Sequence, residues 1–497
     1  MKFSAIGCYV LLAAGVAASA ADQPQFGQRF TRNMASTERN LPDSFDLSSG
    51  KNVAWVAELG TQTWSTPTIG SGRVLVTTNN ANPRDPKHKG DRGVLMCFDE
   101  KTGQFQWQLV VPKLEEDDFF DWPNVGMCSP ATIEGQRAYV VTNRGEVVCV
   151  TLDGLAKGNI GPFKDEGRHM TRPSEPALEP GPLDADIVWL YDIRNELKLH
   201  QHDSAHGSVL IDGDFLYINT SNGVDRTHKA LPTPDAPGLI VLDKRTGKLV
   251  AKEDESIGRD VIHCTWSSPS LGEINGRRLV FFIGGNGVCY AFDALKDTPP
   301  AGEVKLMKAV WKFDCDPTAP KQNIHAYTGN RKESASNSYG MPVFADGRVY
   351  LIAGGDVFWG KRQSWMKCVD AAKTGDITQG GLVWQYEIPT HSLCTPAVAD
   401  GLAYMTDCAK MVHCIDAATG KVIWTHKTNG EIWACPLVAD GKVYVGTRKG
   451  DFWILAAGRE KKVLAQIDIN EPMNGSVTAA NGTVYVTTMS RLIALRR

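Results

Sequence analysis

The chain has 497 residues, of which 42% are hydrophobic, and a formal net charge of -3. It is long for one ordinary compact domain, and this length suits an architecture that grows by adding repeats. The near-neutral charge argues against a nucleic-acid partner, which would need a basic face.

The chain begins with a segment typical of a secretory signal. Met1-Lys2 is followed by an apolar run from Phe3 to Ala17 and by the small residues Ala18-Ser19-Ala20. This order predicts a signal peptide over residues 1 to 20, cleaved after Ala20. We therefore expect an exported mature protein, located in the periplasm or outside the cell.

The same segment bears on membrane attachment. The apolar run is too short to span a bilayer, and no later segment is suited to doing so. Cys8 lies in the early part of the run rather than at a lipoprotein cleavage point, so no lipid anchor is expected.

Residues 21 to 50 are polar and show no periodicity, so they are expected to form an N-terminal strap. Asn52 to Ala57, which contains Trp55, resembles the last strand of the repeat described next.

From residue 51 onward the chain repeats a pattern of four short apolar segments. The clearest copy runs from Cys394 to Thr428. Alternating apolar residues between turn residues such as Asp400-Gly401 are strand and hairpin signals. They predict strands at Thr395–Ala399, Leu402–Thr406, Met411–Asp416 and Val422–His426.

The spacing of the copies predicts the architecture. Pro436 opens the next copy 40 residues after Pro396, near the length of one four-stranded propeller blade. Eight copies are found, at Thr66–Trp107, Ser129–Trp189, Gly207–Ala251, Ser268–Trp311, Met341–Trp384, Cys394–Thr428, Pro436–Ala465 and Ser476–Arg497. The last copy ends after its third strand, so the strand around Trp55 is expected to complete it and close the ring. The sequence thus predicts an all-β, eight-bladed β-propeller over residues 51 to 497.

Tryptophan recurs near the fourth-strand position of six blades. A large ring there is expected to pack between blades, which cannot bury their apolar faces alone. The six residues are Trp55, Trp107, Trp189, Trp311, Trp384 and Trp424.

Eleven of the twelve cysteines remain once Cys8 is removed with the signal. Four occupy third-strand positions where a small apolar residue is needed, and free cysteine serves there: Cys97, Cys149, Cys368 and Cys414. Cys394 and Cys408 flank one hairpin, and the sequence is compatible both with a disulfide between them and with two free thiols.

Four long polar or Pro-rich insertions interrupt the repeats. Insertions on successive repeats tend to collect on one face, which is often the binding face. They run over Asn79–Arg92, Gly158–Pro182, Asn222–Pro237 and Asp316–Ser338.

The repeat, [ST]-P-x-x-x-x-G-x-x-Y-V followed by C-x-D-x-x-T-G-x-x-x-W, resembles the pyrroloquinoline quinone (PQQ)-type propeller repeat. Clear copies are Thr395–Trp424, Val438–Lys462, Gly93–Trp107 and Pro237–Leu249. The resemblance implies relatives among PQQ-dependent alcohol and glucose dehydrogenases, the eight-bladed scaffold lipoprotein of the outer-membrane barrel-assembly machinery, and exported bacterial propellers of unsettled role.

The chain departs from these relatives in three ways. It has no adjacent cysteine pair of the kind found beside PQQ in the alcohol dehydrogenases, no fused haem domain, and no lipid-anchor cysteine. The resemblance therefore supports the architecture better than it supports PQQ or Ca²⁺ as cofactors.

The first strand of each blade lines the central channel, so equal offsets in the repeat lie at one height. Each copy has near its start a proline, or the residue that stands in its place, which we call the Pro-equivalent position. The residues three places before it in the eight copies are Trp64, Met127, Ala205, Trp266, Tyr339, Leu393, Trp433 and Asn474. The aromatic members, Trp64, Trp266, Tyr339 and Trp433, are candidates for binding a flat ligand such as a quinone or a sugar ring. The alternative is that these rings simply plug a wide channel.

A second register, five or six residues before the Pro-equivalent position itself, carries polar groups. His202, His263 and His391 are candidate ligands for a transition metal. Asp203 and Glu431 would suit Ca²⁺, or would act as the catalytic base if PQQ were bound. The alternative is a set of loop histidines that make ordinary hydrogen bonds. These registers contain no Arg or Lys for the carboxylates of PQQ.

The sequence has no serine-hydrolase elbow, zinc-protease helix or phosphate-binding loop. The leading hypothesis is therefore an exported, non-catalytic binding or scaffold propeller with a protein or glycan partner on its loop-rich face. The alternative is a PQQ- and divalent-metal-dependent quinoprotein dehydrogenase acting on an alcohol or a sugar.

Overall fold

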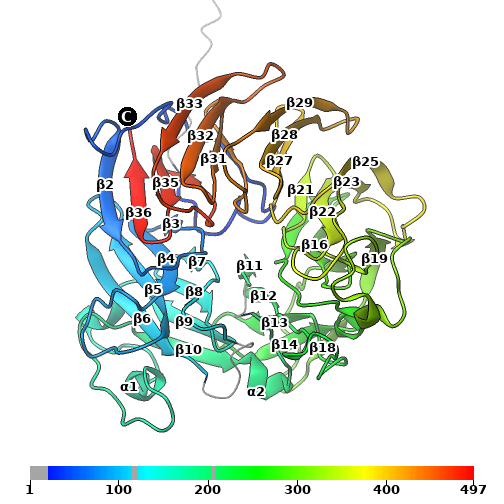
Figure 1. Cartoon of the computed structure of the whole chain (residues 1–497). Coiled ribbons are helices and arrows are strands. Elements are labelled where there is room, and N and C mark those ends of the chain that lie inside the picture. Colours follow the sequence, from blue (N-terminus) through cyan, green and yellow to red (C-terminus); the bar gives the residue numbers. More distant parts are fainter. Residues whose placement is uncertain (1–20, 115–120, 204–206) are drawn as a thin grey trace, which may run out of the picture.

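In the computed structural model, which describes residues 21–114, 121–203 and 207–497, the chain is a ring of β-sheets. Over these residues eight sheets stand around a central axis (Figure 1). Each has four antiparallel strands as its core, with the first strand of the repeat innermost. The predicted all-β, eight-bladed propeller is confirmed, whereas the predicted signal peptide lies outside the described residues.

The first half of the ring has these strands. Blade one contains β3 (Thr68–Gly70), β4 (Arg73–Asn79), β5 (Arg92–Asp99) and β6 (Phe105–Pro112). Blade two contains β7 (Thr132–Glu134), β8 (Arg137–Val141), β9 (Glu146–Thr151) and β10 (Ile187–Asp192). Blade three contains β11 (Leu210–Asp212), β12 (Phe215–Asn219), β13 (Leu239–Asp243) and β14 (Leu249–Glu253), with β18 (Lys305–Met307) added at its edge. Blade four contains β15 (Ser270–Ile274), β16 (Arg277–Ile283), β17 (Val288–Asp293) and β19 (Ala309–Asp314), with β24 (Gly375–Asp376) at its edge.

The second half follows the same plan. Blade five contains β21 (Val343–Ala345), β22 (Arg348–Gly355), β23 (Ser364–Asp370) and β25 (Leu382–Ile388), and β20 (Ser336–Asn337) also pairs with β22. Blade six contains β26 (Ala397–Ala399), β27 (Leu402–Thr406), β28 (Met411–Asp416) and β29 (Val422–Lys427). Blade seven contains β30 (Leu437–Ala439), β31 (Lys442–Gly446), β32 (Asp451–Ala456) and β33 (Val463–Asp468), with β1 (Ala35–Ser36) beside β30. Blade eight contains β34 (Thr478–Ala480), β35 (Thr483–Thr487), β36 (Arg491–Leu495) and β2 (Val53–Glu58). The short helices are α1 (Glu166–His169) and α2 (Ile193–Leu197), besides single 3₁₀ turns at Gly154–Lys157, Ile257–Asp260 and Ile324–Tyr327.

Blade six follows the predicted strands to within two residues at every end. Its first hairpin turns at Asp400 and Gly401, whose φ angles are 51° and 71°. Both residues are left-handed, as a two-residue type I′ turn requires, and Asp-Gly is suited to that backbone.

The ring closes through blade eight, as the sequence predicts. Strand β2, near the start of the chain, runs antiparallel to β36 at its end, with Val56 opposite Ile493. The two ends of the propeller therefore share one sheet, and closure removes a free edge from both.

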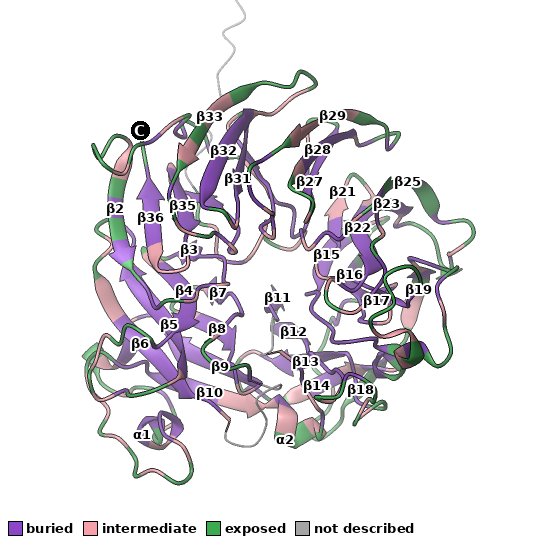
Figure 2. Cartoon of the chain, in the orientation of Figure 1, coloured by how far each residue is buried: buried purple, intermediate pink, exposed green. Residues whose placement is uncertain are grey.

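The six predicted tryptophans pack between blades, and all are at most 9% exposed. Each indole N–H donates a hydrogen bond to a backbone carbonyl of the next blade, for example from Trp107 to Leu152 O at 2.8 Å and from Trp384 to Ala417 O at 2.9 Å. Glycines of the next blade's turn, such as Gly420 against Trp384, leave room for the ring. Figure 2 shows the consequence, with the inner strands buried and the outermost strands partly exposed.

The cysteines expected to fill small apolar positions, Cys97, Cys149, Cys368 and Cys414, are all fully buried, which confirms that prediction. All eleven cysteines in the described part of the chain are free thiols, Cys394 and Cys408 included.

The segment predicted as a strap crosses the inner strands of the ring. Carbonyl oxygens of the strap accept hydrogen bonds from backbone N–H groups in the first strands of five blades. The donors are Ile69, Ile133, Leu271, Phe344 and Val438, and their acceptors are Gln23, Pro24, Phe30, Thr31 and Met34 respectively. Asn33 exchanges two amide hydrogen bonds with the backbone of Val398, both 2.8 Å long. Ala21 O accepts from Asn481 N in blade eight. The strap is thus tied around the whole ring.

Arg32 anchors the strap at its centre and is fully buried. Its guanidinium donates to Pro269 O at 2.9 Å, to Phe26 O at 3.0 Å, and to Ser208 Oγ and Ser208 O at 2.9 Å each. No carboxylate among the described residues forms an ion pair with it, and burial lowers the pKa of Arg32 to about 9.

Three of the four predicted insertions leave the blades at the end of the channel where the first strands begin. The fourth, over residues 158–182, leaves from the far end of β9 and folds back along the blade. There His169 Nε2 lies 3.0 Å from Glu146 Oε2, at the start of β9. Long loops therefore gather around one mouth of the channel.

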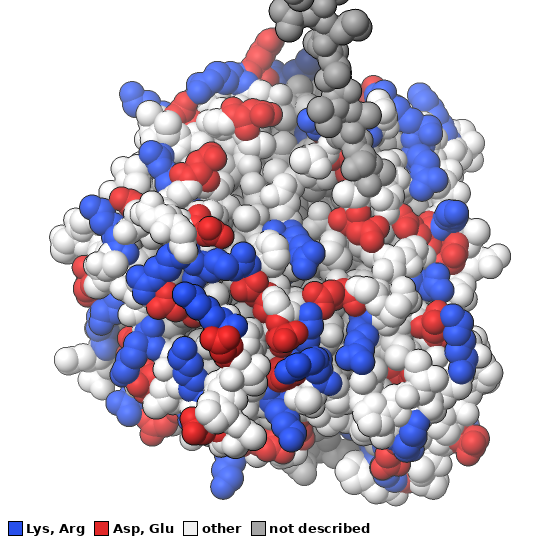
Figure 3. All heavy atoms as spheres, turned by 180° about the vertical axis from the view of Figure 1, so that it is seen from behind, with Lys and Arg blue, Asp and Glu red and all other residues white. Residues whose placement is uncertain are grey.

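None of the helices in the described residues is long and apolar enough to cross a membrane. Lys and Arg are interspersed with Asp and Glu over the face seen in Figure 3.

Candidate functional site

A cavity of about 560 Å³ opens on the channel axis at the loop-rich mouth. Of the eight residues placed there by the repeat register, six line it: Trp64, Trp266, Tyr339, Leu393, Trp433 and Asn474. They belong to the segments that enter the first strands, so equal offsets in the sequence do give one height around the axis.

The other two of the eight register residues are Met127 and Ala205. Met127 is fully buried and packs in the core between blades one and two. The left-handed Gly126, with φ of 78°, precedes it and redirects the chain into that core. Ala205 lies outside the described residues.

The aromatic side chains form contacting pairs. Trp266 and Tyr339 stack with ring centroids 4.6 Å apart and planes inclined by 18°. Trp64 and Trp433 lie 5.7 Å apart at 45°. These four residues were the predicted platform for a flat ligand, and the structure brings them to one cavity.

The cavity also has aromatic walls that the register does not predict. Phe358 and Trp359 come from the loop between β22 and β23, and Trp122 comes from the connection between blades one and two. Phe26, from the strap, lines the cavity as well. None of these residues occupies a repeated offset, so periodicity carries no signal for them.

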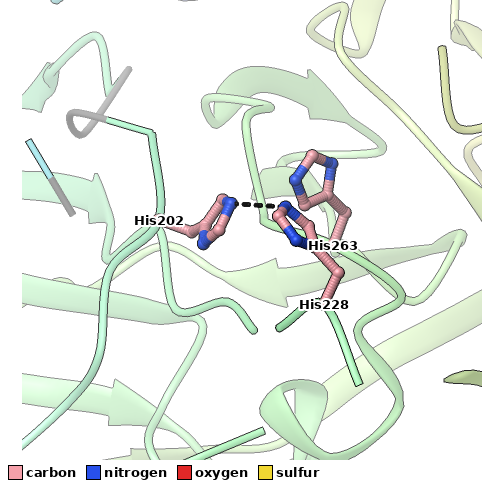
Figure 4. Close-up of side chains that lie close together, drawn as sticks. All are labelled: His202, His228 and His263. Carbon is pink, nitrogen blue, oxygen red and sulfur yellow. Dashed lines mark hydrogen bonds between the residues drawn. The ribbon is translucent and has the colours of Figure 1, made fainter. Parts of the chain in front are cut away.

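Three histidines lie close together (Figure 4), and two of them, His228 and His263, line the cavity. His202, His228 and His263 come from three different loops, and one ring nitrogen of each lies within 4.8 Å of the other two. The ring centroids are 4.8 to 5.0 Å apart. His202 and His263 are each 1% exposed and His228 is 9% exposed.

The tautomer of His202 follows from its partners. Its Nδ1 lies 2.9 Å from the carbonyl oxygen of Val224, which only accepts, so Nδ1 carries the proton. Burial and the neighbouring rings of His263 and His228 lower the pKa of His202 to about 3, so the ring is neutral near pH 7. Its Nε2 lone pair therefore faces His228 Nε2, 3.1 Å away.

His263 is oriented by a carboxylate. Its Nδ1 donates to Asp356 Oδ2 at 3.1 Å, and Asp356 is fully buried. Burial alone would raise the pKa of Asp356, but the charge and hydrogen bond of His263 and the hydroxyl of Tyr339 hold it below its ordinary value. The opposite nitrogen of His263, Nε2, is buried and has no hydrogen-bond partner within the described residues.

Asp356 also organises the aromatic wall. It accepts from the Tyr339 hydroxyl at 2.7 Å and from the backbone N–H groups of Phe358 at 3.0 Å and Trp359 at 2.8 Å. One buried carboxylate thus fixes a histidine, a stacked tyrosine and an aromatic loop.

Asp203 completes the polar side of the cavity. Its carboxylate oxygens lie 3.7 Å from His202 Nε2 and 3.8 Å from His263 Nε2, and its side chain is 24% exposed. Burial raises the pKa of Asp203 to about 6. Asp203 and His228 both have left-handed backbones, with φ of 54° and 57°, a conformation in which Asp and His are enriched.

The other two polar candidates take partners of their own. His391 Nε2 contacts the carbonyl oxygen of Lys361 at 2.9 Å and is not part of the three-histidine group. Glu431 accepts from Trp433 Nε1 at 2.8 Å and lies 3.4 Å from Arg448 Nη1. The register gives the height of a residue but not its place around the ring: His202 and His263 precede neighbouring blades, while His391 precedes a blade two steps further on.

Two residues of the candidate site escape the sequence analysis. His228 lies inside the insertion Asn222–Pro237, which was predicted to belong to the binding face without naming a residue in it. Asp356 directly follows β22, in the loop before β23, and the sequence analysis assigns it no role. The available signal for Asp356 was a carboxylate placed directly after the hairpin of the two inner strands β21 and β22.

The lining of the cavity does not fit PQQ. That cofactor carries three carboxylates and an ortho-quinone, and such groups are held by Arg or Lys. The described lining residues include neither, and they do include Asp203. Arg448 lies over Trp433 at 4.0 Å, but it is engaged by Glu431. Cys128 and Cys435 line the cavity singly rather than as an adjacent pair.

Comparison with known proteins supports the repeat. The family model described as outer membrane protein assembly factor BamB matches residues 362–497. The chain is similar to a quinohemoprotein alcohol dehydrogenase of Comamonas testosteroni, with 34% identity over 130 residues, 24% of this chain and 18% of that protein. It is also similar to a 1-butanol dehydrogenase (cytochrome c) of Thauera butanivorans, with 30% identity over 124 residues, 21% of this chain and 18% of that protein. The chain thus matches less than a fifth of the length of either relative.

Among solved structures, the chain is similar to BamB from Moraxella catarrhalis. The TM-score is 0.52 at 13% sequence identity, over 90% of this chain and 97% of that one. At this identity the likeness shows the fold alone.

Proposed function

Since the chain is built from PQQ-type propeller repeats, we propose that it is an exported, non-catalytic binding propeller that holds a neutral glycan in its axial cavity. The observation that carries the proposal is the chemistry of the lining: paired aromatic rings with a few polar groups and no cationic side chain among the described lining residues.

The aromatic pairs suit a sugar ring. A pyranose presents two apolar C–H faces, which stack on the negative face of an aromatic ring. Trp266 with Tyr339, and Trp64 with Trp433, provide two such surfaces around one cavity. Ligand sites of this kind are mostly apolar and carry a small number of placed polar groups that fix orientation.

Polar groups are available for the hydroxyls. Asp203 accepts hydrogen bonds, and Asn474, Ser268 and Ser476 line the same cavity. A neutral, hydroxyl-rich ring uses all of these groups, whereas a polyanionic quinone would meet Asp203 with no Arg or Lys among the described lining residues. This contrast favours the binding function over the quinoprotein dehydrogenase.

Export and partners belong to the same proposal. The segment with signal character precedes Ala21, and a propeller that binds glycans outside the cytoplasm needs no membrane span of its own. The BamB family named above is described as an outer membrane protein assembly factor. A protein partner on the loop-rich face is therefore the outcome to consider if glycans fail.

The test is a thermal-shift and tryptophan-fluorescence titration of the folded chain with a panel of neutral oligosaccharides. A ligand that binds only the folded state raises the melting temperature by mass action. Trp433→Ala and Trp266→Ala are each expected to weaken binding about tenfold, since an aromatic contact is worth ~0.5–1.5 kcal/mol beyond the area it buries.

Trp453→Phe is the matched control, because Trp453 lies on β32, away from the cavity, and its variant should bind as the wild type does. Trp433 is partly exposed, so its replacement is expected to leave the fold intact. Saturable binding that both cavity variants leave unchanged, or no glycan binding across the panel, would overturn the proposal.

A further inference from the structure

We infer that His202, His228 and His263 form a binding site for Zn²⁺, with the carboxylate of Asp203 beside its fourth coordination position. The inference goes beyond the proposed glycan function and holds whichever ligand occupies the cavity.

The donor set selects the ion. Three imidazole nitrogens suit Zn²⁺ and related transition metals, whereas Ca²⁺ requires six to eight oxygen ligands. With Zn–N bonds of about 2.0–2.1 Å, tetrahedral geometry places ligand nitrogens about 3.3–3.4 Å apart. His202 Nε2 and His228 Nε2 are 3.1 Å apart, and the whole group lies within 4.8 Å. Small rotations of the rings bring the nitrogens to the required spacing.

The rings are already oriented as ligands. His202 Nδ1 donates to Val224 O and His263 Nδ1 donates to Asp356 Oδ2. Metal-binding histidines generally donate their second N–H to a carbonyl or a carboxylate, which fixes the tautomer and the ring orientation. The carboxylate–histidine pair of Asp356 and His263 is this arrangement.

A second observation points to a missing ligand. His263 Nε2 is buried and has no hydrogen-bond partner among the described residues, although a buried polar nitrogen without a partner is costly. It points into the group formed with His202 and His228 (Figure 4). An ion at the centre satisfies it.

The fourth position lies toward the cavity. Asp203, His228 and His263 line the cavity, whereas His202 closes the buried side. A zinc site with three protein ligands keeps one position for water or another ligand. Asp203, 3.7 and 3.8 Å from two of the ligand nitrogens, is placed to bind the ion or to accept from a bound water.

The experiment uses the folded chain freed of metal with a chelator. Zn²⁺ is titrated in competition with a chromophoric chelator, bound zinc is counted by mass spectrometry, and Co²⁺ is used as a spectroscopic substitute. We expect one Zn²⁺ per chain, visible absorption typical of tetrahedral Co²⁺, and no comparable binding of Ca²⁺.

The variants assign the site. His263→Ala and His228→Gln are each expected to weaken zinc binding by at least about 100-fold, since loss of even an outer-shell partner costs 10–100-fold. His228 lies on a surface loop, so His228→Gln keeps the test valid if His263→Ala fails to fold. His426→Gln, on the outermost strand β29, should bind as the wild type does.

Absence of stoichiometric zinc in the wild-type chain would overturn the inference. So would two folded histidine variants that bind zinc as tightly as the wild type. The glycan titration is carried out separately with and without metal, so failure of either proposal is recognised independently.

Discussion

Replacing Asp356 with alanine is expected to lower the free energy of unfolding by about 3–5 kcal/mol, the usual cost of breaking a buried charged network. The substitution leaves the N–H of His263, the hydroxyl of Tyr339 and the backbone N–H groups of Phe358 and Trp359 without their acceptor. A buried donor without an acceptor costs about 1–3 kcal/mol, and the N–H of His263 is fully buried. Denaturant unfolding followed by fluorescence measures the loss.

The variant Asp356→Asn separates the effect of Asp356 on the orientation of the His263 ring from its effect on the stability of the fold. The amide keeps the shape and one acceptor oxygen, so most of the stability should return. It no longer holds the His263 ring as a carboxylate does, and zinc affinity should still fall by about 10–100-fold.

Asp407→Asn is the matched control. Asp407 is likewise buried after a second strand, and it accepts from His413 Nε2 at 3.0 Å and from two backbone N–H groups. We expect normal zinc affinity in that variant. Equal zinc affinity in Asp356→Asn and the wild type would contradict the role given to Asp356.

Arg32→Leu is expected to destabilise the chain by a few kcal/mol. Two opposing effects decide whether the substitution lowers or raises the free energy of unfolding. The fall in the pKa of Arg32 from 12.5 to about 9 means that burial costs the charged form about 5 kcal/mol, and leucine removes that cost. Against this, the substitution breaks four hydrogen bonds from a charged donor, each worth about 1.5–3 kcal/mol. The lost hydrogen bonds outweigh the recovered solvation.

The measurement is the denaturant midpoint of Arg32→Leu beside that of Arg39→Leu, a strap arginine that is exposed. The Arg39 variant should unfold like the wild type. Because Phe26 lies in the same strap and lines the cavity, loosening at Arg32 should also weaken ligand binding. A variant at Arg32 that is as stable as the wild type or more so would show that burial of the charge dominates.

The fold was predictable because the repeat obeys local rules. Alternation with a period of two and Asp-Gly turns locate the strands of blade six to within two residues. Trp55 identifies the closing strand, because it stands where the other blades carry their inter-blade tryptophan. The strand and turn signals lie within one copy of about forty residues, and the place of Trp55 follows from the order of the copies along the chain.

The site was predictable only where the repeat extends into it. Trp64, Trp266, Tyr339 and Trp433 share one offset, and all four line the cavity. His228 and Asp356 belong to loops whose course is set by tertiary contacts rather than by the repeat. His391 shares a height with His202 and His263 but stands at another place around the ring, and its nitrogen meets Lys361 O instead.

The strap contained the least signal. Residues 21–50 have no periodicity, because their backbone follows the inner strands of one blade after another rather than a sheet of its own. Arg32 and Phe26 therefore looked like ordinary polar and apolar residues of a connecting segment.

We propose that the axial cavity of this propeller serves a neutral ring-shaped ligand rather than the cofactor after which its repeat is named. The most direct test is a titration of the folded chain with PQQ, with and without Ca²⁺, followed by melting temperature and tryptophan fluorescence. For the chain freed of zinc we predict no rise in melting temperature and no saturable quenching, because three carboxylates would enter a lining that has no Arg or Lys among its described residues. A saturable, Ca²⁺-dependent rise, accompanied by quenching and lost in Trp266→Ala, would contradict the binding of a neutral ligand and place the chain among the quinoproteins.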